Sequence, residues 1–188
     1  MTSIPPKNGL LLLDGAQYDD AFDWLSEHYG PDNPLALLKG TPYEPIAGAG
    51  PFLLNASFGS AAYNEWWGGG DLQRGVWLGS LKSANQLLPI LQRRLRIFDE
   101  QRREFWLRLA DGPVLNRARL AGAQWPAGFW CGVDSVWLRH GGASVCAWTN
   151  ETPELDSAMA DNGLAAQIIL PNALLHALSL PANTEQHS

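Results

Sequence analysis

The residues that could do chemistry are few in this chain of 188 residues, and they are scattered along it. Asp14 follows a run of leucines, and a carboxylate there could accept a phosphoryl group or act as a general acid or base. An aspartate between a strand and a helix is more often a helix cap, so we favour the cap. No two of the four histidines have the i, i+4 spacing of a helical metal site: His28, His140, His176 and His187. We therefore assign no metal.

The candidate nucleophiles lack the neighbours that would activate them. Ser57 lies in Ala-Ser-Phe-Gly and not in the Gly-x-Ser-x-Gly elbow of hydrolases. The three glycines at 68–70 lack the Lys-Ser/Thr of a phosphate-binding loop. Cys131 has no local group that would depress the pKa of its thiol. We therefore expect no catalytic residue and no cofactor, and a small α/β enzyme is the less favoured alternative.

Charge and composition exclude several classes of partner. The net charge of −6 and the pI near 5.1 disfavour nucleic acids and anionic membranes. The apolar run at 10–13 is far too short for a membrane span. Cys131 and Cys146 form no metal or disulfide motif, so we expect free buried thiols in the cytoplasm. Nine tryptophans indicate a binding surface, since some indoles usually lie at interfaces.

Short strands alternate with helices along most of the chain. Hydrophobic patterns and turn residues predict strands over 10–13, 52–54, 76–78 and 104–109. They predict helices over 17–29, 33–39, 60–67 and 114–120. Ser83 and Gln86 have capping-box spacing, so a helix is expected from there through Phe98, with a kink or a later start because of Pro89. We expect parallel pairing among the earlier strands.

A hairpin closes the predicted domain. Residues 129–139 and 144–149 flank Gly141-Gly142, which places Cys146 opposite Trp137. Short helices are predicted over 153–160 and 172–180, before a polar end that we expect to be disordered. The expected fold is a mixed α/β domain over 1–150, with a central mixed sheet of about five or six strands and the C-terminal hairpin at one edge. Residues 151–188 form a short helical or partly disordered tail.

Four ordered blocks of the sequence resemble one family. They are Leu-Leu-Leu-Asp-Gly-Ala at 11–16; Leu-Leu-Lys-Gly-Thr-Pro at 37–42 with Gly-Pro-Phe-Leu-Leu at 50–54; Trp-Leu-Gly-Ser at 77–80 before the leucine-rich 87–95; and 105–115, which ends Asp-Gly-Pro-Val-Leu. In this order the blocks resemble the type VI secretion effector chaperones, the adaptors that deliver toxins to the VgrG spike. Each block alone is an ordinary turn or strand, so the resemblance lies in their order.

This resemblance implies a cytoplasmic bacterial protein that binds a secreted effector protein and the VgrG spike, with no cofactor and no reaction. Such binding needs an exposed patch of apolar and aromatic anchors. Trp66, Trp67 and Trp125 are our candidates, because each lies near glycine or proline and outside a clear buried stripe. For each of them, a role in capping the core is an equal alternative. An immunity protein that neutralises a toxin would fit the acidic charge and the tryptophans equally well.

Overall fold

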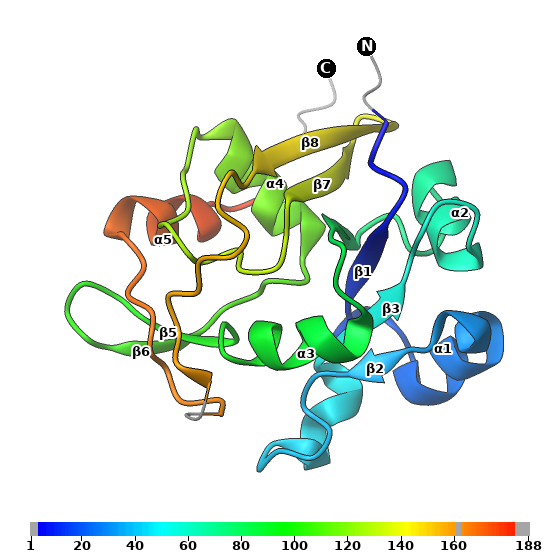
Figure 1. The fold of residues 1–188 in the computed structure, drawn as a ribbon, viewed down its shortest axis with the longest axis horizontal. Helices are drawn as coiled ribbons and strands as arrows, with labels where there is room; N and C mark the ends of the chain where they lie inside the picture. The colour runs from blue at the N-terminus through cyan, green and yellow to red at the C-terminus, as the bar shows by residue number, and fades with distance from the viewer. Residues whose placement is uncertain (1–3, 161–162, 183–188) are drawn as a thin grey trace.

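Six strands form one sheet with the order β2-β3-β1-β4-β7-β8 (Figure 1). The computed structural model describes residues 4–160 and 163–182 of the protein. The strands are β1 (Gly9–Asp14), β2 (Leu35–Ala36), β3 (Pro51–Asn55), β4 (Val76–Gly79), β7 (Ser135–His140) and β8 (Ala143–Thr149). The mixed α/β class is confirmed, and so is the β7–β8 hairpin at one edge.

The expected parallel pairing is wrong, because every pairing in this sheet is antiparallel. Alternation of strands and helices does not fix strand direction. The connection from β2 to β3 contains η3 (Glu44–Ala49), a 3-10 helix, and it returns the chain beside β2 in the opposite direction. A parallel pair would instead need a full crossover from one end of the sheet to the other.

In the described part of the chain, five α-helices surround the sheet, and local capping signals fix where several of them begin. They are α1 (Ala21–Tyr29), α2 (Ala61–Gly68), α3 (Ala84–Gln92), α4 (Gly112–Leu120) and α5 (Asn172–Leu178). Ser60 caps α2, and Ser83 forms the expected capping box with Gln86. Pro89 lies inside α3 but does not delay its start. The 3-10 helices η1 (Gly15–Gln17) and η2 (Gly30–Asp32) flank α1, which therefore begins later than expected.

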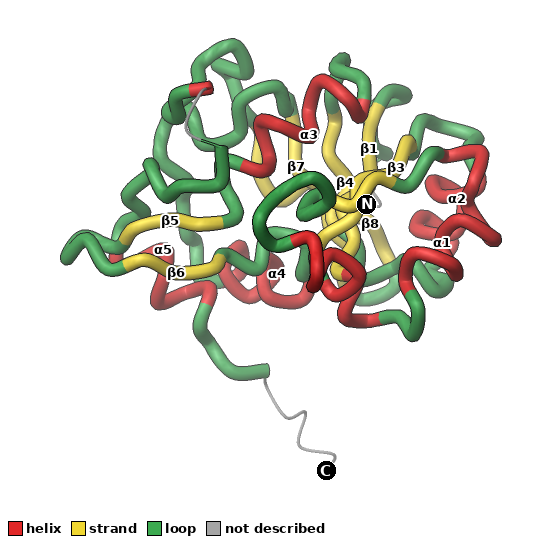
Figure 2. Tube along the Cα trace, turned by 90° about the horizontal axis from the view of Figure 1, so that it is seen from below, coloured by secondary structure: helices red, strands yellow, loops and turns green. Residues whose placement is uncertain are grey.

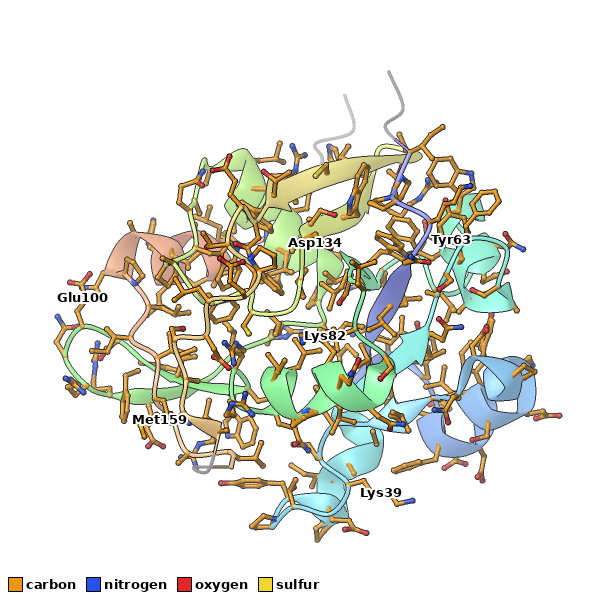
Figure 3. All side chains as sticks on the ribbon, in the orientation of Figure 1. Lys39, Tyr63, Lys82, Glu100, Asp134 and Met159 are labelled. Carbon is orange, nitrogen blue, oxygen red and sulfur yellow. The ribbon has the colours of Figure 1, made fainter. Side chains whose placement is uncertain are left out.

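The leucines of β1 lie at the centre of the core. Leu10 to Leu13 are all buried, as a strand covered on both faces requires. The sheet separates two ends of the molecule: α1 and α2 lie at one end, and α5 lies with a small ribbon of two strands at the other (Figures 1 and 2). Figure 3 shows Tyr63 on α2 at the first end and Glu100 at the tip of the ribbon. No helix among the described residues is long and apolar enough to cross a membrane.

The small ribbon pairs β5 (Arg96–Phe98) with β6 (Glu104–Trp106) in antiparallel register. The helix expected to run through Phe98 in fact ends at Gln92, because a turn follows and Arg96–Phe98 then pair with β6. The strand expected over 104–109 ends at Trp106. On its other side, Phe98 bonds to the C-terminal segment through a bridge to Ile169. This contact ties the C-terminal segment to the domain.

Three further expected elements are corrected by tertiary contacts. Residues 33–39 contain β2 and turns in place of a helix, since Leu35 and Ala36 pair with β3. Residues 129–134 are turns that lead into β7. Residues 153–160 form no α-helix, because the Pro153 carbonyl and the Ser157 amide bond to the loop at 128–132. The expected helix at 172–180 is confirmed as α5.

The hairpin register follows the expectation from its glycines. Trp137 lies opposite Cys146, and a bulge follows Val136. Both cysteines are free, with Cys131 buried and Cys146 partly buried. The polar end expected to be disordered, residues 183–188, lies outside the described residues.

Candidate functional site: an apolar groove beside an exposed strand

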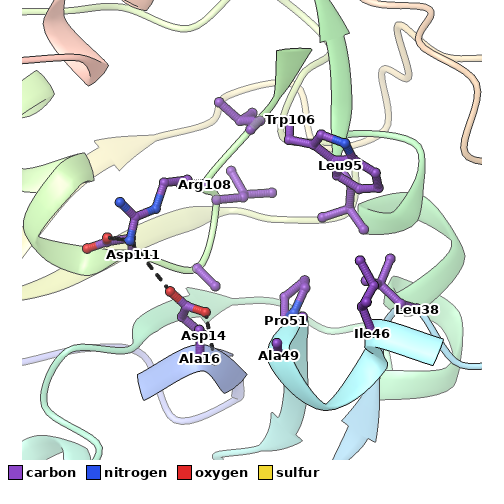
Figure 4. Close-up of a pocket in the computed structure, with 14 residues that line it drawn as sticks. Asp14, Ala16, Leu38, Ile46, Ala49, Pro51, Leu95, Trp106, Arg108 and Asp111 are labelled. Carbon is purple, nitrogen blue, oxygen red and sulfur yellow. Dashed lines mark hydrogen bonds and ion pairs between the residues drawn. The ribbon is translucent and has the colours of Figure 1, made fainter. Parts of the chain in front are cut away.

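A groove with a volume of about 380 Å³ opens between the β5–β6 ribbon and the segment from η3 to β3 (Figure 4). Most of its lining is apolar, and the side chains come from four separate stretches of the chain. They are Leu38, Ile46, Ala49, Pro51, Leu95, Trp106, Leu107, Leu109 and Ala110. We call this surface the Trp106 groove. Its outer wall carries exposed apolar side chains, since Ile46 and Trp106 retain 56% and 48% of their accessible surface.

Trp106 is exposed and yet held in place by neighbours. Its ring meets the Tyr43 ring edge-on, with the centroids 4.9 Å apart. The Arg96 guanidinium lies 5.7 Å from the Trp106 centroid and 6.0 Å from the Tyr43 centroid. Arg96 also donates a 2.9 Å hydrogen bond to the Tyr43 hydroxyl and pairs with Glu104. These contacts pre-organise an exposed indole, which lowers the entropy lost when a partner binds it.

Charged residues close one end of the groove. Arg108 bonds to Asp111 at 2.6 Å and approaches Asp14 at 3.7 Å (Figure 4). The Asp14 carboxylate accepts from the Ala16 amide and caps η1, as the sequence indicated. The Asp111 carboxylate accepts from the Val114 amide and caps α4. Both carboxylates therefore hold backbone and arginine donors, and they orient the walls of the groove.

A second groove of about 390 Å³ lies on the other side of the same segment. Phe105, Val114, Leu175 and Leu178 supply apolar lining, and Asp99 and Arg103 supply charge. Trp106, Leu107 and Arg108 line both grooves. The segment from Glu104 to Arg108 is therefore a ridge with a hollow on each side.

Asp99 fixes the loop that carries the ridge. It is 2% exposed, and its carboxylate accepts hydrogen bonds from the amides of Gln101 and Arg103 and from the Arg103 guanidinium. Burial alone would raise the pKa of Asp99, but these hydrogen bonds and the Arg103 charge lower it below its ordinary value. The tip of the ribbon is also held to α5, since Glu100 bonds to Asn172.

The tryptophans singled out from the sequence do not lie at the Trp106 groove. The prediction that Trp66 is an exposed anchor is wrong. Trp66 is fully buried, and its indole donates a 3.1 Å hydrogen bond to the Gly75 carbonyl. On α2 it shares the sheet-facing side with Ala62 and Tyr63, which is a helical core spacing. Trp67 is half-buried and stacks on Tyr63. Its role as a partner contact stays a prediction.

Trp125 belongs to another cluster. It stacks on Phe129 with the centroids 4.4 Å apart and meets Trp130 and Trp148 edge-on. Among residues 4–160 and 163–182, no ring contact joins this cluster with Trp66 or Trp67. The three residues therefore form no common surface patch, and a binding role for Trp125 also stays a prediction.

Sequence reasoning missed Trp106, although a signal was present. Phe105 and Trp106 are adjacent in a strand, so their side chains point to opposite faces. The flanking Arg103, Glu104 and Arg108 indicate a solvated strand, and at least one of the two aromatic rings then has to lie at the surface.

Part of the chain matches the model of a known protein family. The model of a family described as "Domain of unknown function (DUF4123)" matches residues 10–124, which is more than half of the chain. No curated protein and no solved structure matches the chain. The matched residues run from β1 to just beyond α4 and include every residue that lines the Trp106 groove. Part of the second groove, supplied by α5, lies outside them.

Proposed function

Because this chain belongs to the DUF4123 family, we propose that it is an adaptor that binds a toxic effector of the type VI secretion system and helps to load it onto the VgrG spike, without catalysis. The family match supports this proposal because the blocks that resemble effector chaperones all fall inside it: 11–16, 37–42, 50–54, 77–80 with 87–95, and 105–115. Each of these blocks also contributes lining to the Trp106 groove: Asp14 and Ala16, Leu38 with Gly50 and Pro51, Leu95, and residues 106–111.

The single observation that carries the proposal is the exposed, pre-organised Trp106 at the edge of an apolar groove. Binding energy in protein interfaces concentrates in a few aromatic and arginine anchors beside desolvated pockets. Trp106 and the flanking Arg96 are residues of these types, and their geometry is set before any partner arrives. An apolar side chain of the effector would fill the groove and bury the exposed faces of Trp106 and Ile46.

The polar side chains at the groove support binding over acid–base chemistry. Asp14 and Asp111 serve as helix caps and as partners of Arg108. Their carboxylate oxygens are used by backbone amides and a guanidinium, and this arrangement favours a fixed wall for a partner.

Co-purification from the native bacterium tests the proposal. The tagged protein is recovered under gentle conditions, its partners are identified by mass spectrometry, and toxin activity is assayed in the recovered complex. Recovery of spike protein together with an active toxin is the expected result. A toxin recovered alone and inhibited would identify an immunity protein, and recovery of neither would overturn the adaptor function.

The variant Trp106→Ala locates the binding surface. It is expected to lose effector with a fall in melting temperature of only about 2–4 °C, because Trp106 is half exposed and loses only its contacts with Tyr43 and Arg96. Phe58→Ala is the matched control, since Phe58 is also a well-exposed aromatic residue but does not line the Trp106 groove. Equal loss of effector in both variants would show that the groove is not the site.

A further inference from the structure

The outer edge of β6 has unpaired backbone groups. Asp99 and Arg103 bond through their backbones at one end of the ribbon, and Leu95 and Leu107 do so at the other. In an antiparallel ladder, hydrogen-bonded and non-bonded pairs alternate. Phe98 with Glu104 and Arg96 with Trp106 are therefore the non-bonded pairs, and the N–H and C=O groups of Glu104 and Trp106 point away from β5.

The backbone of Phe98 verifies this geometry. Its amide donates to the Ile168 carbonyl and its carbonyl accepts from the Leu170 amide, both on the side of β5 away from β6. Its partner in register, Glu104, must then direct its own backbone groups outward. No described residue makes a backbone hydrogen bond to these groups of Glu104 or Trp106.

This edge lacks the usual protection against pairing. Exposed edge strands are normally blunted by charged side chains, proline or a covering loop. Glu104 is the one charged residue of β6, and its carboxylate is held by Arg96 on the ribbon itself. Phe105 and Trp106 then offer apolar surface on the two faces of the strand.

From these observations we propose that β6 is a docking edge. An extended segment of the bound effector pairs with this edge as a further strand, antiparallel or parallel to β6. The segment would bond to the backbone of Glu104 and Trp106 and would place an apolar side chain in the Trp106 groove. This inference rests on the proposed function, because it specifies how a protein partner is held.

The arginines beside β6 indicate which side chains the partner segment has at its two ends. Arg103 and Arg108 flank β6, and their side chains are 69% and 62% exposed. Their partners Asp99 and Asp111 are buried, so the solvent meets the guanidinium groups and not the carboxylates. Acidic side chains flanking an apolar centre would complement this edge. A second copy of this chain would bring the same two arginines to the edge and is the poorer match.

A random peptide library displayed on phage tests the docking edge without any knowledge of the effector. The wild-type protein is the target, and the selected peptides are synthesised and measured against two variants. Glu104→Pro removes the outward N–H and leaves the bonds to β5 intact, and proline is tolerated at a strand edge. Glu104→Ala removes the same carboxylate but keeps the N–H.

Selected peptides are expected to combine apolar and acidic residues and to bind Glu104→Pro up to about tenfold more weakly than Glu104→Ala, the loss that one backbone hydrogen bond would cause. In the wild-type protein, bound peptide should slow hydrogen exchange at the Glu104 and Trp106 amides, a readout that does not depend on the folding of a variant. Equal binding to both variants with unchanged exchange, failure to select any peptide, or a dimer of the free protein in solution would overturn the docking edge. The adaptor function is tested separately, by the recovery of effector and spike in the co-purification.

Discussion

The Arg94 guanidinium, which is 1% exposed, binds the Asp156 carboxylate at 2.6 Å and so ties the C-terminal segment to the interior of the domain. Arg94 also donates to three backbone carbonyls, those of Ile90, Gly128 and Phe129. Arg93 bonds to the same carboxylate at 3.0 Å. One partly exposed aspartate is therefore the shared ion-pair partner of two buried arginines, and removal of that aspartate leaves both guanidinium groups without it.

Asp156→Ala is expected to lower the free energy of unfolding by about 2–3 kcal/mol, as measured by urea denaturation. Breaking a buried ion pair typically costs more, but Asp156 keeps some contact with water and Arg94 keeps its carbonyl partners. Glu154→Ala is the control, because it removes the same charge from an exposed position in the same loop. A loss no greater than that of the control would show that the pair contributes nothing to stability.

Stability from this pair should depend on pH in one direction. Burial alone would raise the pKa of Asp156, but hydrogen bonds from Arg94 and the Ala158 amide, together with the arginine charge, lower it below the ordinary 3.8. The contribution is therefore complete above the ordinary pKa and is lost as the pH falls through the lowered pKa of the folded state. The free energies of unfolding of wild type and Asp156→Asn should converge in acid. A gap that stays constant or widens as the pH falls would contradict this assignment.

Trp66 and Trp67 should behave differently although they are neighbours. Trp66→Ala removes a fully buried side chain and is expected to cost about 3–5 kcal/mol. Trp67→Ala removes a half-buried ring stacked on Tyr63 and is expected to cost about 1 kcal/mol. Thermal and urea unfolding of the two single variants measure the difference. Similar losses in both would mean that Trp66 is less buried than the fold requires.

The thiols should react slowly in the folded protein. Burial raises the pKa of Cys131, and the Asp156 carboxylate adds to that effect. Burial likewise raises the pKa of Cys146. Alkylation by iodoacetamide near neutral pH should therefore be much slower for both cysteines in native protein than in urea-unfolded protein, because the thiolate is the reacting form. Fast modification of Cys131 in the native protein would contradict the prediction that its thiol is unreactive.

Local signals explain which elements the sequence predicted correctly. The leucine run of β1, the Ser83 capping box of α3 and the glycine pair of the β7–β8 hairpin each act through residues only a few positions apart. The serine cap supplies a hydrogen bond within its own helix, and the two hairpin glycines, both with positive φ, supply the turn. These features therefore depend little on how distant segments of the chain pack.

The Trp106 groove depends on contacts between segments that are distant in the sequence. The local pattern predicts a strand at Trp106, but the exposure of its side chain follows from the two-stranded ribbon, in which β6 has β5 as its partner on one edge. The groove exists because Tyr43 and Ile46 of the first half of the chain face Trp106 of the second. The residue pattern of one strand does not show which distant segment will form the opposite wall of a groove.

The sequence by itself determined the α/β class, most strands and helices, the hairpin register and the blocks that resemble the effector chaperones. Tertiary structure alone decided the antiparallel direction of the sheet, the burial of Trp66 and the exposure of Trp106. It also replaced a predicted helix at 153–160 with a loop whose Asp156 binds Arg94, 62 residues away. The physical reason is range: helix caps and turns are satisfied within a few residues, whereas burial, strand direction and ion pairing depend on which distant segments meet.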